Sequence, residues 1–217
     1  MQTDIRYLDP ILEIMAAHWP NNRSVNVVCH GHSVPAGYFA TPYVNTFGSY
    51  PHLLHRIIKE RYPFAVVNVI VTAIGGETSV EGERRFDRDV LNHNPDLVTI
   101  DYSLNDRRRE PEAVKAAWSA MIERALARGV KVILLTPSWD NSYYAYNENW
   151  KALEDRAKLV CRLAETYGVG LADTFERFGD YIRRGGNLQA LLSHVNHPSE
   201  EGHAIIADEI AKYFPAR

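Results

Sequence analysis

Short apolar runs alternate along the chain with longer segments in which apolar residues recur every three or four positions. The short runs are rich in valine and isoleucine and are typical of buried β-strands. They occupy residues 25–29, 65–72, 97–102, 130–135 and 169–172. The longer segments predict amphipathic helices at residues 4–18, 49–62, 78–92, 111–128, 148–167 and 199–214. Residues 174–196 follow neither period, and we expect them to be irregular with short helical turns.

Local signals fix several of the helix ends. Pro51 stands in the first turn of its segment, where proline is tolerated. Thr78 and Glu81 have the spacing of a capping box, and Gly129 follows its segment in the position of a C-terminal stop. Strands that alternate with helices in this way predict an α/β fold, with a parallel sheet covered by helices on both faces. No linker or repeat interrupts the pattern, so we expect residues 1–217 to form a single domain.

The composition is that of a globular protein and excludes several function classes. The 217 residues carry a formal net charge of -3, which gives no reason to expect nucleic acid or an anionic membrane as a partner. No run of about 18 apolar residues is present, and acids at Asp4 and Asp9 do not fit a secretory signal, so a cytoplasmic location is the default expectation. We interpret Cys29 and Cys161 as inert core thiols. The oligomeric state is left open.

Polar groups suited to acyl transfer follow the ends of the predicted strands or precede the last helix. They are Ser33, Gly76, Asn105 and His197. The carboxyl ends of parallel strands meet at one edge of a sheet, where ligands bind, so we expect these groups to converge. Ester hydrolysis needs a nucleophile, a base and donors to the developing oxyanion, and no metal or other cofactor. We predict Ser33 as the nucleophile and His197 as the base. The N–H groups of Ser33 and Gly76 and the amide of Asn105 are the predicted oxyanion donors.

These groups belong to short sequence blocks. In chain order the blocks are Gly31-His32-Ser33, Gly75-Gly76-Glu77-Thr78, Ser103-Leu104-Asn105-Asp106 and His194-Val195-Asn196-His197-Pro198. They resemble the blocks of the SGNH, or GDSL-type, hydrolase superfamily, which read roughly Gly-Asp-Ser, a glycine in a Gly-Asp-Thr-type turn, Gly-x-Asn-Asp and Asp-x-x-His-Pro. The resemblance implies a flavodoxin-like three-layer α/β/α fold with a central five-stranded parallel sheet. It also implies esterase, lipase, thioesterase or carbohydrate acetylesterase activity.

The chain departs from the family pattern at two positions. The residue before the nucleophile, an aspartate in the family, is His32, which places an imidazole beside Ser33. The residue three positions before His197, where the family has the triad acid, is His194. A histidine cannot stabilise a neighbouring imidazolium as a carboxylate does. We therefore expect either a Ser–His dyad or an atypical triad.

Two arrangements could orient His197 in the absence of the usual aspartate. In the first, a backbone carbonyl holds the imidazole, which gives the dyad, and we favour this arrangement. In the second, another side chain takes the place of the acid. The possible His-orienting residues are His194, Asp140, Glu200 and Glu201.

Aromatic residues crowd the loop after the fourth strand, next to the predicted site. They are Trp139, Tyr143, Tyr144, Tyr146 and Trp150. Such side chains could stack on a sugar ring or line an acyl pocket, and they could equally form a lid on the core or a subunit interface. We expect Trp139, Tyr143 and Tyr144 to line the substrate site together with His32 and Arg107. From the family analogy, O-acetyl groups on a carbohydrate are the leading substrate class.

Two other function classes remain open at this point. If His194 abolishes catalysis, the chain is a weak or inactive member of the fold that binds carbohydrate without cleaving it. Alternatively, imidazoles and an acid could hold zinc and activate water. The residues available for such a site are His30, His32, His194, His197, His203 and Asp106.

Overall fold

The computed structural model describes residues 4–216, which form a five-stranded sheet in which all neighbouring strands are parallel. The strand order is β2-β1-β3-β4-β5. The strands are β1 (Ser24–Gly31), β2 (Val66–Val71), β3 (Leu97–Asp101), β4 (Lys131–Leu135) and β5 (Gly170–Ala172). This is the flavodoxin-like order. The predicted α/β class and the five-stranded parallel sheet are therefore confirmed.

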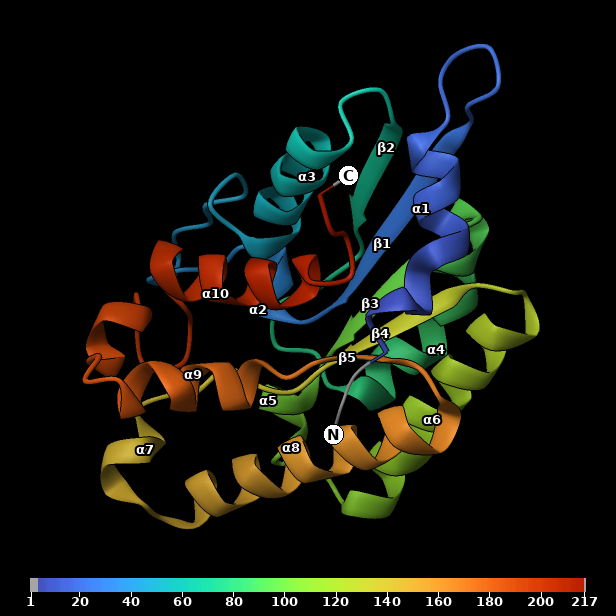
Figure 1. Ribbon diagram of the computed structural model, residues 1–217. Helices are drawn as coiled ribbons and strands as arrows, with labels where there is room; N and C mark the ends of the chain where they lie inside the picture. The colour runs from blue at the N-terminus through green and yellow to red at the C-terminus, as the bar shows by residue number, and fades with distance from the viewer. Residues whose placement is uncertain (1–3, 217) are drawn as a thin grey trace.

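Helices cover both faces of the sheet (Figure 1). The longer ones are α1 (Asp9–Ala16), α3 (Tyr50–Arg61), α4 (Ser79–Asp89), α6 (Pro111–Ala127), α8 (Glu148–Tyr167), α9 (Thr174–Arg183) and α10 (Glu200–Ala211). Single-turn helices α2 (Ser33–Ala36), α5 (Ser103–Asp106) and α7 (Ser142–Ala145) follow strands. In the described part of the chain, three 3-10 helices complete the set: η1 (Ile5–Leu8), η2 (Leu91–His93) and η3 (Leu188–Leu191).

The sheet separates two buried cores, because alternate residues of a strand point to opposite faces. Val27 and Cys29 of β1 face the core formed with α1, α3, α9 and α10. Val28, between them, faces the core formed with α4, α6 and α8. The three-layer α/β/α arrangement follows from this division.

Most of the predicted elements agree with the structure, and three differ. Residues 4–18 divide into η1 and α1, with Pro10 in the first turn of α1. The predicted irregular stretch contains a regular helix, α9, whose N-terminus is capped by the side chain of Asp173. The last helix ends at Ala211 rather than at residue 214, because Tyr213 and Phe214 leave the helix and are fully buried in the core.

The capping box before α4 has the predicted form. The Glu81 carboxylate accepts the N–H of Thr78 at 3.0 Å, and the Thr78 side chain accepts a backbone N–H of the first turn. Gly129 has a φ of 72°, which suits a helix stop that favours glycine.

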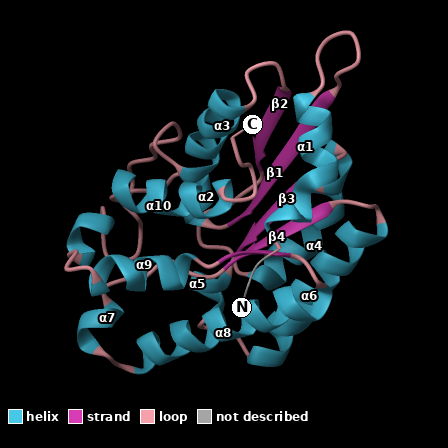
Figure 2. Ribbon diagram, viewed as in Figure 1, coloured by secondary structure: helices cyan, strands magenta, loops and turns pink. Residues whose placement is uncertain are grey.

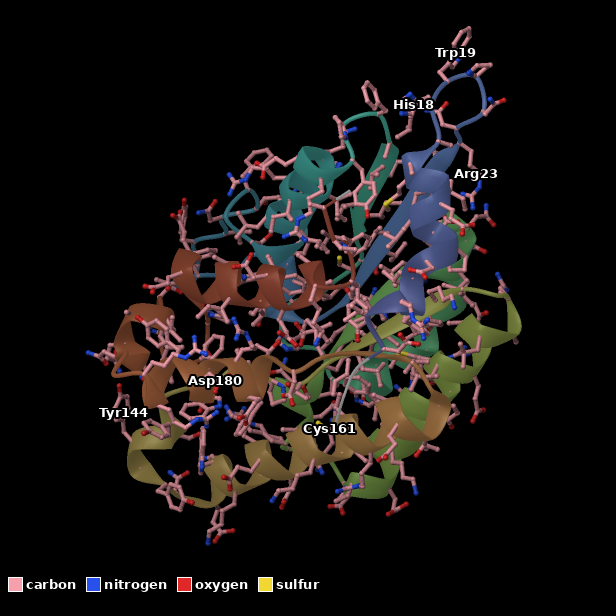
Figure 3. The ribbon with its side chains drawn as sticks, in the orientation of Figure 1. His18, Trp19, Arg23, Tyr144, Cys161 and Asp180 are labelled. Carbon is pink, nitrogen blue, oxygen red and sulfur yellow. The ribbon has the colours of Figure 1, made fainter. Side chains whose placement is uncertain are left out.

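The carboxyl ends of the strands point to the side of the molecule where α2, α5, α7 and α9 lie (Figure 2). The loop that carries Trp19 projects from the opposite end of β1 (Figure 3). Loops at the carboxyl ends therefore hold the residues that sequence analysis predicts as the site. Within residues 4–216, no helix has the length and apolar character that crossing a bilayer requires.

Candidate active site

Ser33 begins the single-turn helix α2 directly after the end of β1. Gly31 is required at this turn, because a Cβ there would lie 2.4 Å from the carbonyl oxygen of Asp101. His32 is the N-cap of α2, and its side chain accepts the N–H of Val34 at 3.2 Å. Gly37, with a φ of 86°, ends α2. The chain thus presents the Ser33 hydroxyl at the carboxyl edge of the sheet with 7% of the residue exposed.

His197 lies next to Ser33, although 163 residues separate them in the chain. The distance between His197 Nε2 and Ser33 Oγ is 3.0 Å, within hydrogen-bond reach. The loop before α10 holds the imidazole in place: Leu192 and Pro198 form an antiparallel bridge, and the N–H of Ser193 donates to the carbonyl of His197 at 2.9 Å. The structure therefore brings together the two residues that the sequence predicts as nucleophile and base.

The other nitrogen of His197, Nδ1, lies 2.8 Å from the backbone carbonyl oxygen of Phe39. A carbonyl can only accept, so Nδ1 must carry the hydrogen and Nε2 is left to accept from Ser33. Burial lowers the pKa of His197 below its ordinary value of 6.5; His32 and His194 also lower it, and the Phe39 contact partly opposes them. This geometry matches the backbone-oriented arrangement favoured from the sequence.

Asp140, one of the predicted orienting residues, has other partners. Arg107 Nη1 donates to Asp140 Oδ2 at 2.5 Å, and the N–H of Ser142 donates to Oδ1 at 3.0 Å. Asp140 is buried and Arg107 is half-buried with 9% of its side chain exposed, so the guanidinium is neutralised within the protein. Arg107 therefore has a structural partner in Asp140, and its predicted contact with substrate stays a prediction.

The three remaining orienting residues also have different surroundings. Glu200 Oε1 accepts from the side-chain amide of Asn45 at 3.0 Å. Glu201 accepts from the hydroxyl of Tyr181, and His194 is exposed. Within residues 4–216, the hydrogen-bond partner of His197 Nδ1 is the Phe39 carbonyl and no carboxylate.

The predicted oxyanion donors lie on the neighbouring loops. Gly76 has a φ of 82°, and within residues 4–216 neither its N–H nor that of Ser33 has a hydrogen-bond acceptor. Asn105 lies in α5 and uses one amide hydrogen to bind the carbonyl of Glu77 at 2.8 Å, which fixes α5 against the Gly76 loop. An amide nitrogen carries two hydrogens, so the second is left for a substrate.

A buried polar network beneath the Gly76 loop was not predicted from the sequence. Arg85 of α4 holds the Glu77 carboxylate through Nε at 2.9 Å and through Nη2 at 2.5 Å. Its Nη2 also contacts the hydroxyl of Tyr102 at 3.2 Å, which in turn lies 3.1 Å from His30 Nε2. The only signal in the sequence is an arginine on the apolar side of a predicted helix.

His32, predicted to line the substrate site, is instead almost completely buried behind Ser33. Its Nδ1 lies 3.5 Å from Ser33 Oγ, and its Nε2 lies 3.4 Å from Oδ1 of Asp101. Asp101 is the last residue of β3 and is 5% exposed. The contact arises because β1 and β3 are adjacent parallel strands, with Gly31 paired to Asp101.

The histidines do not gather as the zinc alternative requires. His30 Nδ1 lies 2.9 Å from the Thr72 hydroxyl, and His203 Nδ1 accepts the N–H of Tyr50 at 3.2 Å. Asp106 accepts from the N–H of Ser79 and from the indole of Trp118. Across residues 4–216, no three His, Cys, Asp or Glu side chains are grouped so that they could hold a metal ion.

The aromatic loop divides into a buried and an exposed part. Trp139 and Trp150 are buried with ring centroids 4.8 Å apart, and Tyr143 stacks on Trp139 at 4.8 Å. Tyr144 is 54% exposed and Tyr146 is 65% exposed. Figure 3 shows Tyr144 on α7 at the outer edge of the molecule. Part of the loop is therefore core, and part is open to a ligand or partner.

The backbone of this loop is tied to the segments around His197. Asn141 N–H donates to the carbonyl of Val195 at 3.0 Å, and the amide of Gln189 donates to the side chain of Asn141 at 3.1 Å. The exposed tyrosines thus belong to a loop that adjoins the His197 loop.

Comparisons with known proteins address the fold and the family of the chain. No curated protein matches the chain in sequence. Among solved structures, the chain is similar to Axe2, an acetylxylan esterase from Geobacillus stearothermophilus, with a TM-score of 0.75 and 20% identity over 89% of this chain and 95% of the other. It is also similar to a G-D-S-L family protein from Desulfitobacterium hafniense DCB-2, with a TM-score of 0.72 and 22% identity over 87% and 99% of the two chains. At these identities the likeness shows the fold.

The family itself is shown by the sequence. Residues 29–205 match the GDSL-like Lipase/Acylhydrolase family. The matched range contains all four blocks, from the end of β1 into α10. The chain therefore belongs to the GDSL-like lipase/acylhydrolase family and is an SGNH-type acyl hydrolase.

Proposed function

We propose that the protein is a serine esterase that removes small acyl groups, with O-acetyl groups on a carbohydrate as the leading substrate, through a Ser33–His197 dyad. The observation that carries the proposal is the pair of contacts at His197: Nε2 at 3.0 Å from Ser33 Oγ and Nδ1 at 2.8 Å from the Phe39 carbonyl. Together they give the imidazole the tautomer and direction that a general base needs.

In the acylation step, Ser33 Oγ attacks the ester carbonyl carbon while its proton moves to His197 Nε2. The negative charge that develops on the carbonyl oxygen is stabilised by hydrogen bonds from the N–H groups of Ser33 and Gly76 and from the free amide hydrogen of Asn105. His197 then returns the proton to the leaving alcohol as the C–O bond breaks. An acyl group remains on Ser33.

In the deacylation step, water attacks the acyl carbonyl and gives a proton to His197 Nε2. Collapse of the tetrahedral intermediate breaks the bond to Ser33 Oγ, which takes the proton back from His197. The carboxylic acid leaves, and the dyad returns to its starting state.

The carbohydrate part of the proposal rests on two supports. Tyr144 and Tyr146 offer exposed rings on a loop that adjoins the His197 loop, and sugar rings stack on aromatic faces. The similar structure from Geobacillus stearothermophilus is that of an acetylxylan esterase. Catalytic mutants of that esterase replace a serine, a histidine or an aspartate three residues before the histidine. Here the residue three positions before His197 is His194, so a carboxylate at that position does not stabilise the His197 imidazolium.

Product analysis on a substrate panel tests the substrate class. The panel contains acetylated mono- and oligosaccharides, p-nitrophenyl esters of increasing acyl length and acyl thioesters. We expect acetate release from the acetylated sugars with the highest kcat/KM, and a decline as the acyl chain lengthens. A preference for thioesters or for long acyl chains would reject the carbohydrate assignment while leaving the dyad intact.

The dyad predicts how activity depends on pH. His197 acts as a base only when neutral, and burial places its pKa below 6.5. We expect kcat/KM for p-nitrophenyl acetate to reach a plateau on the alkaline side of the His197 pKa and to fall about tenfold per pH unit well below it. His30 and His203, whose pKa values burial lowers to about 3, stay neutral over this range and should not contribute. A half-maximal value above pH 6.5 would contradict the assignment of His197 as the buried base.

Replacing Asn105 by alanine tests the oxyanion donors. The variant removes one donor, and we expect kcat to fall about 10²- to 10³-fold with a small change in KM, because the interaction forms in the transition state. The lost contact to the Glu77 carbonyl also loosens the Gly76 loop. Asn105→Asp keeps the size of the side chain but removes both N–H donors, so it should lose at least as much activity as Asn105→Ala. Unchanged kcat in Asn105→Ala would remove this residue from the site.

A further inference from the structure

A buried carboxylate lies behind the nucleophile, where no cationic side chain of lysine or arginine neutralises it. Asp101 ends β3 with 5% exposure, and within residues 4–216 its one ion-pair contact is His32 Nε2 at 3.4 Å. Asp140, by contrast, is paired with Arg107. Asp101 therefore brings an unneutralised negative charge close to the Ser33 turn.

The tautomer of His32 follows from its neighbours. Nδ1 accepts the N–H of Val34 at 3.2 Å, so the hydrogen of the neutral ring must be on Nε2. Nε2 faces Oδ1 of Asp101 at 3.4 Å, an ion-pair distance at which the ring nitrogen makes no hydrogen bond. The chain of contacts runs from the Asp101 carboxylate through the His32 ring to Ser33 Oγ, which is 3.5 Å from Nδ1. Ser33 thus lies between the imidazoles of His32 and His197. The Asp101 carboxylate lies next to His32, which is not the base.

We propose that Asp101 and His32 are positioning residues for the Ser33–His197 dyad, and that the charge of Asp101 replaces the carboxylate that the chain lacks at position 194. His32 fixes the Ser33 turn through the α2 cap, and its Nε2 faces the carboxylate at 3.4 Å. Asp101 stabilises the imidazolium that forms on His197 when the Ser33 proton is transferred. This inference rests on the proposed function. It explains how the Ser33–His197 pair, in which His197 contacts a neutral backbone carbonyl, can still have a carboxylate that supports it.

The titratable groups around this pair lie on β1, α3, α5 and the His197 loop. Burial raises the pKa of Tyr50, on α3, well above its ordinary value and that of Cys29, on β1, to about 12, so both are neutral near pH 7. Asp106, on α5, is held by Ser79 and Trp118, and burial raises its pKa. Asp106 and His197 both interact with His32, and the pKa of His197 is lowered by burial and by His32 and His194.

Asp101→Asn removes the charge and keeps the shape of the side chain. We expect kcat for p-nitrophenyl acetate to fall about 10- to 100-fold with little change in KM, because the lost interaction forms with the charge on His197. Without the nearby anion the His197 imidazolium is less stable, so its pKa falls. The acid limb of the kcat/KM profile should then move to lower pH by about one unit.

His32→Asn keeps the N-cap of α2 and removes the contact with Asp101. Asparagine can still accept the N–H of Val34, as N-cap residues do, but it is too short to reach Asp101 in place of Nε2. A buried carboxylate that loses a nearby polar neighbour binds a proton more readily. This variant should therefore reproduce both the loss in kcat and the pH shift of Asp101→Asn. The double variant should lose no more than about twofold beyond either single one, because the two residues act as a unit.

Thr99→Val is the matched control. Thr99 is fully buried on the same strand, two residues before Asp101, and the change keeps its shape without altering charge. We expect wild-type kcat and an unshifted profile. Thermal unfolding of every variant checks that the protein measured is folded.

The outcomes separate this inference from the proposed function. Large losses and a shifted acid limb in both single variants, with no additivity, support the pair. Wild-type kcat in His32→Asn and an unshifted limb in Asp101→Asn would overturn the pair while Ser33→Ala remains inactive. Additive losses in the double variant would also overturn it. Wild-type activity in Ser33→Ala would instead reject the proposed function from which the inference starts.

Discussion

Replacing Ser33 by alanine is expected to reduce kcat for p-nitrophenyl acetate by about 10³-fold or more. The hydroxyl is the group that forms the acyl-enzyme, and no other side chain within residues 4–216 lies between an imidazole and the free N–H groups of the turn. Residual hydrolysis by the oxyanion donors alone is expected in nucleophile variants, so the rate should fall to this remnant rather than to zero. Steady-state kinetics with purified protein measure the change.

Ser49→Ala is the matched control for this prediction. Ser49 is also buried, and its hydroxyl donates to the carbonyl of Thr46 at 2.6 Å, at the start of α3. Its loss should cost about 1 kcal/mol of folding stability and leave kcat unchanged. Equal rates in wild type and Ser33→Ala would end the nucleophile assignment.

Replacing His197 by alanine is the second change with a large expected effect. The variant removes the acceptor of the Ser33 proton and the donor to the leaving alcohol, and we expect kcat to fall about 10³-fold or more. The Ser33→Ala/His197→Ala double variant should be no less active than either single variant, because two residues that act in one step do not contribute additively. Kinetics of the three variants at one pH test this directly.

His194→Ala is the control for the base. His194 is exposed and lies three residues before His197, at the position of the acid in the family pattern. Because the Phe39 carbonyl already holds His197 Nδ1, we expect this variant to keep activity within about threefold of wild type. A loss comparable to that of His197→Ala would mean that His194 takes part in catalysis and that the dyad is incomplete.

Hydrophobic periodicity and strand-end chemistry predicted much of the molecule. Valine-rich runs between amphipathic segments are sufficient to indicate a parallel α/β sheet, and each loop at the carboxyl edge could be recognised by its polar residue. Ser33 and His197, far apart in sequence, lie 3.0 Å apart for this reason. The helix α9 was missed, because residues 174–196 contain both a helix and an irregular segment and no single period describes them.

The partners of the site residues could not be predicted, because they depend on register and backbone position. The Phe39 carbonyl has no side-chain signature that a sequence displays. Asp101 reaches His32 only because β1 and β3 are neighbours with Gly31 opposite Asp101. Asp140 was an orienting candidate because of its position after a strand. Only the fold reveals that the Asp140 carboxylate forms an ion pair with Arg107.

The most direct test of the account is covalent labelling with a fluorophosphonate, which reacts with activated serine hydroxyls, followed by peptide mass spectrometry. The account predicts a single adduct on Ser33, formed at a rate that falls in His197→Ala and is unchanged in Ser49→Ala. A label on a different residue, or an unlabelled protein that still hydrolyses p-nitrophenyl acetate, would contradict it.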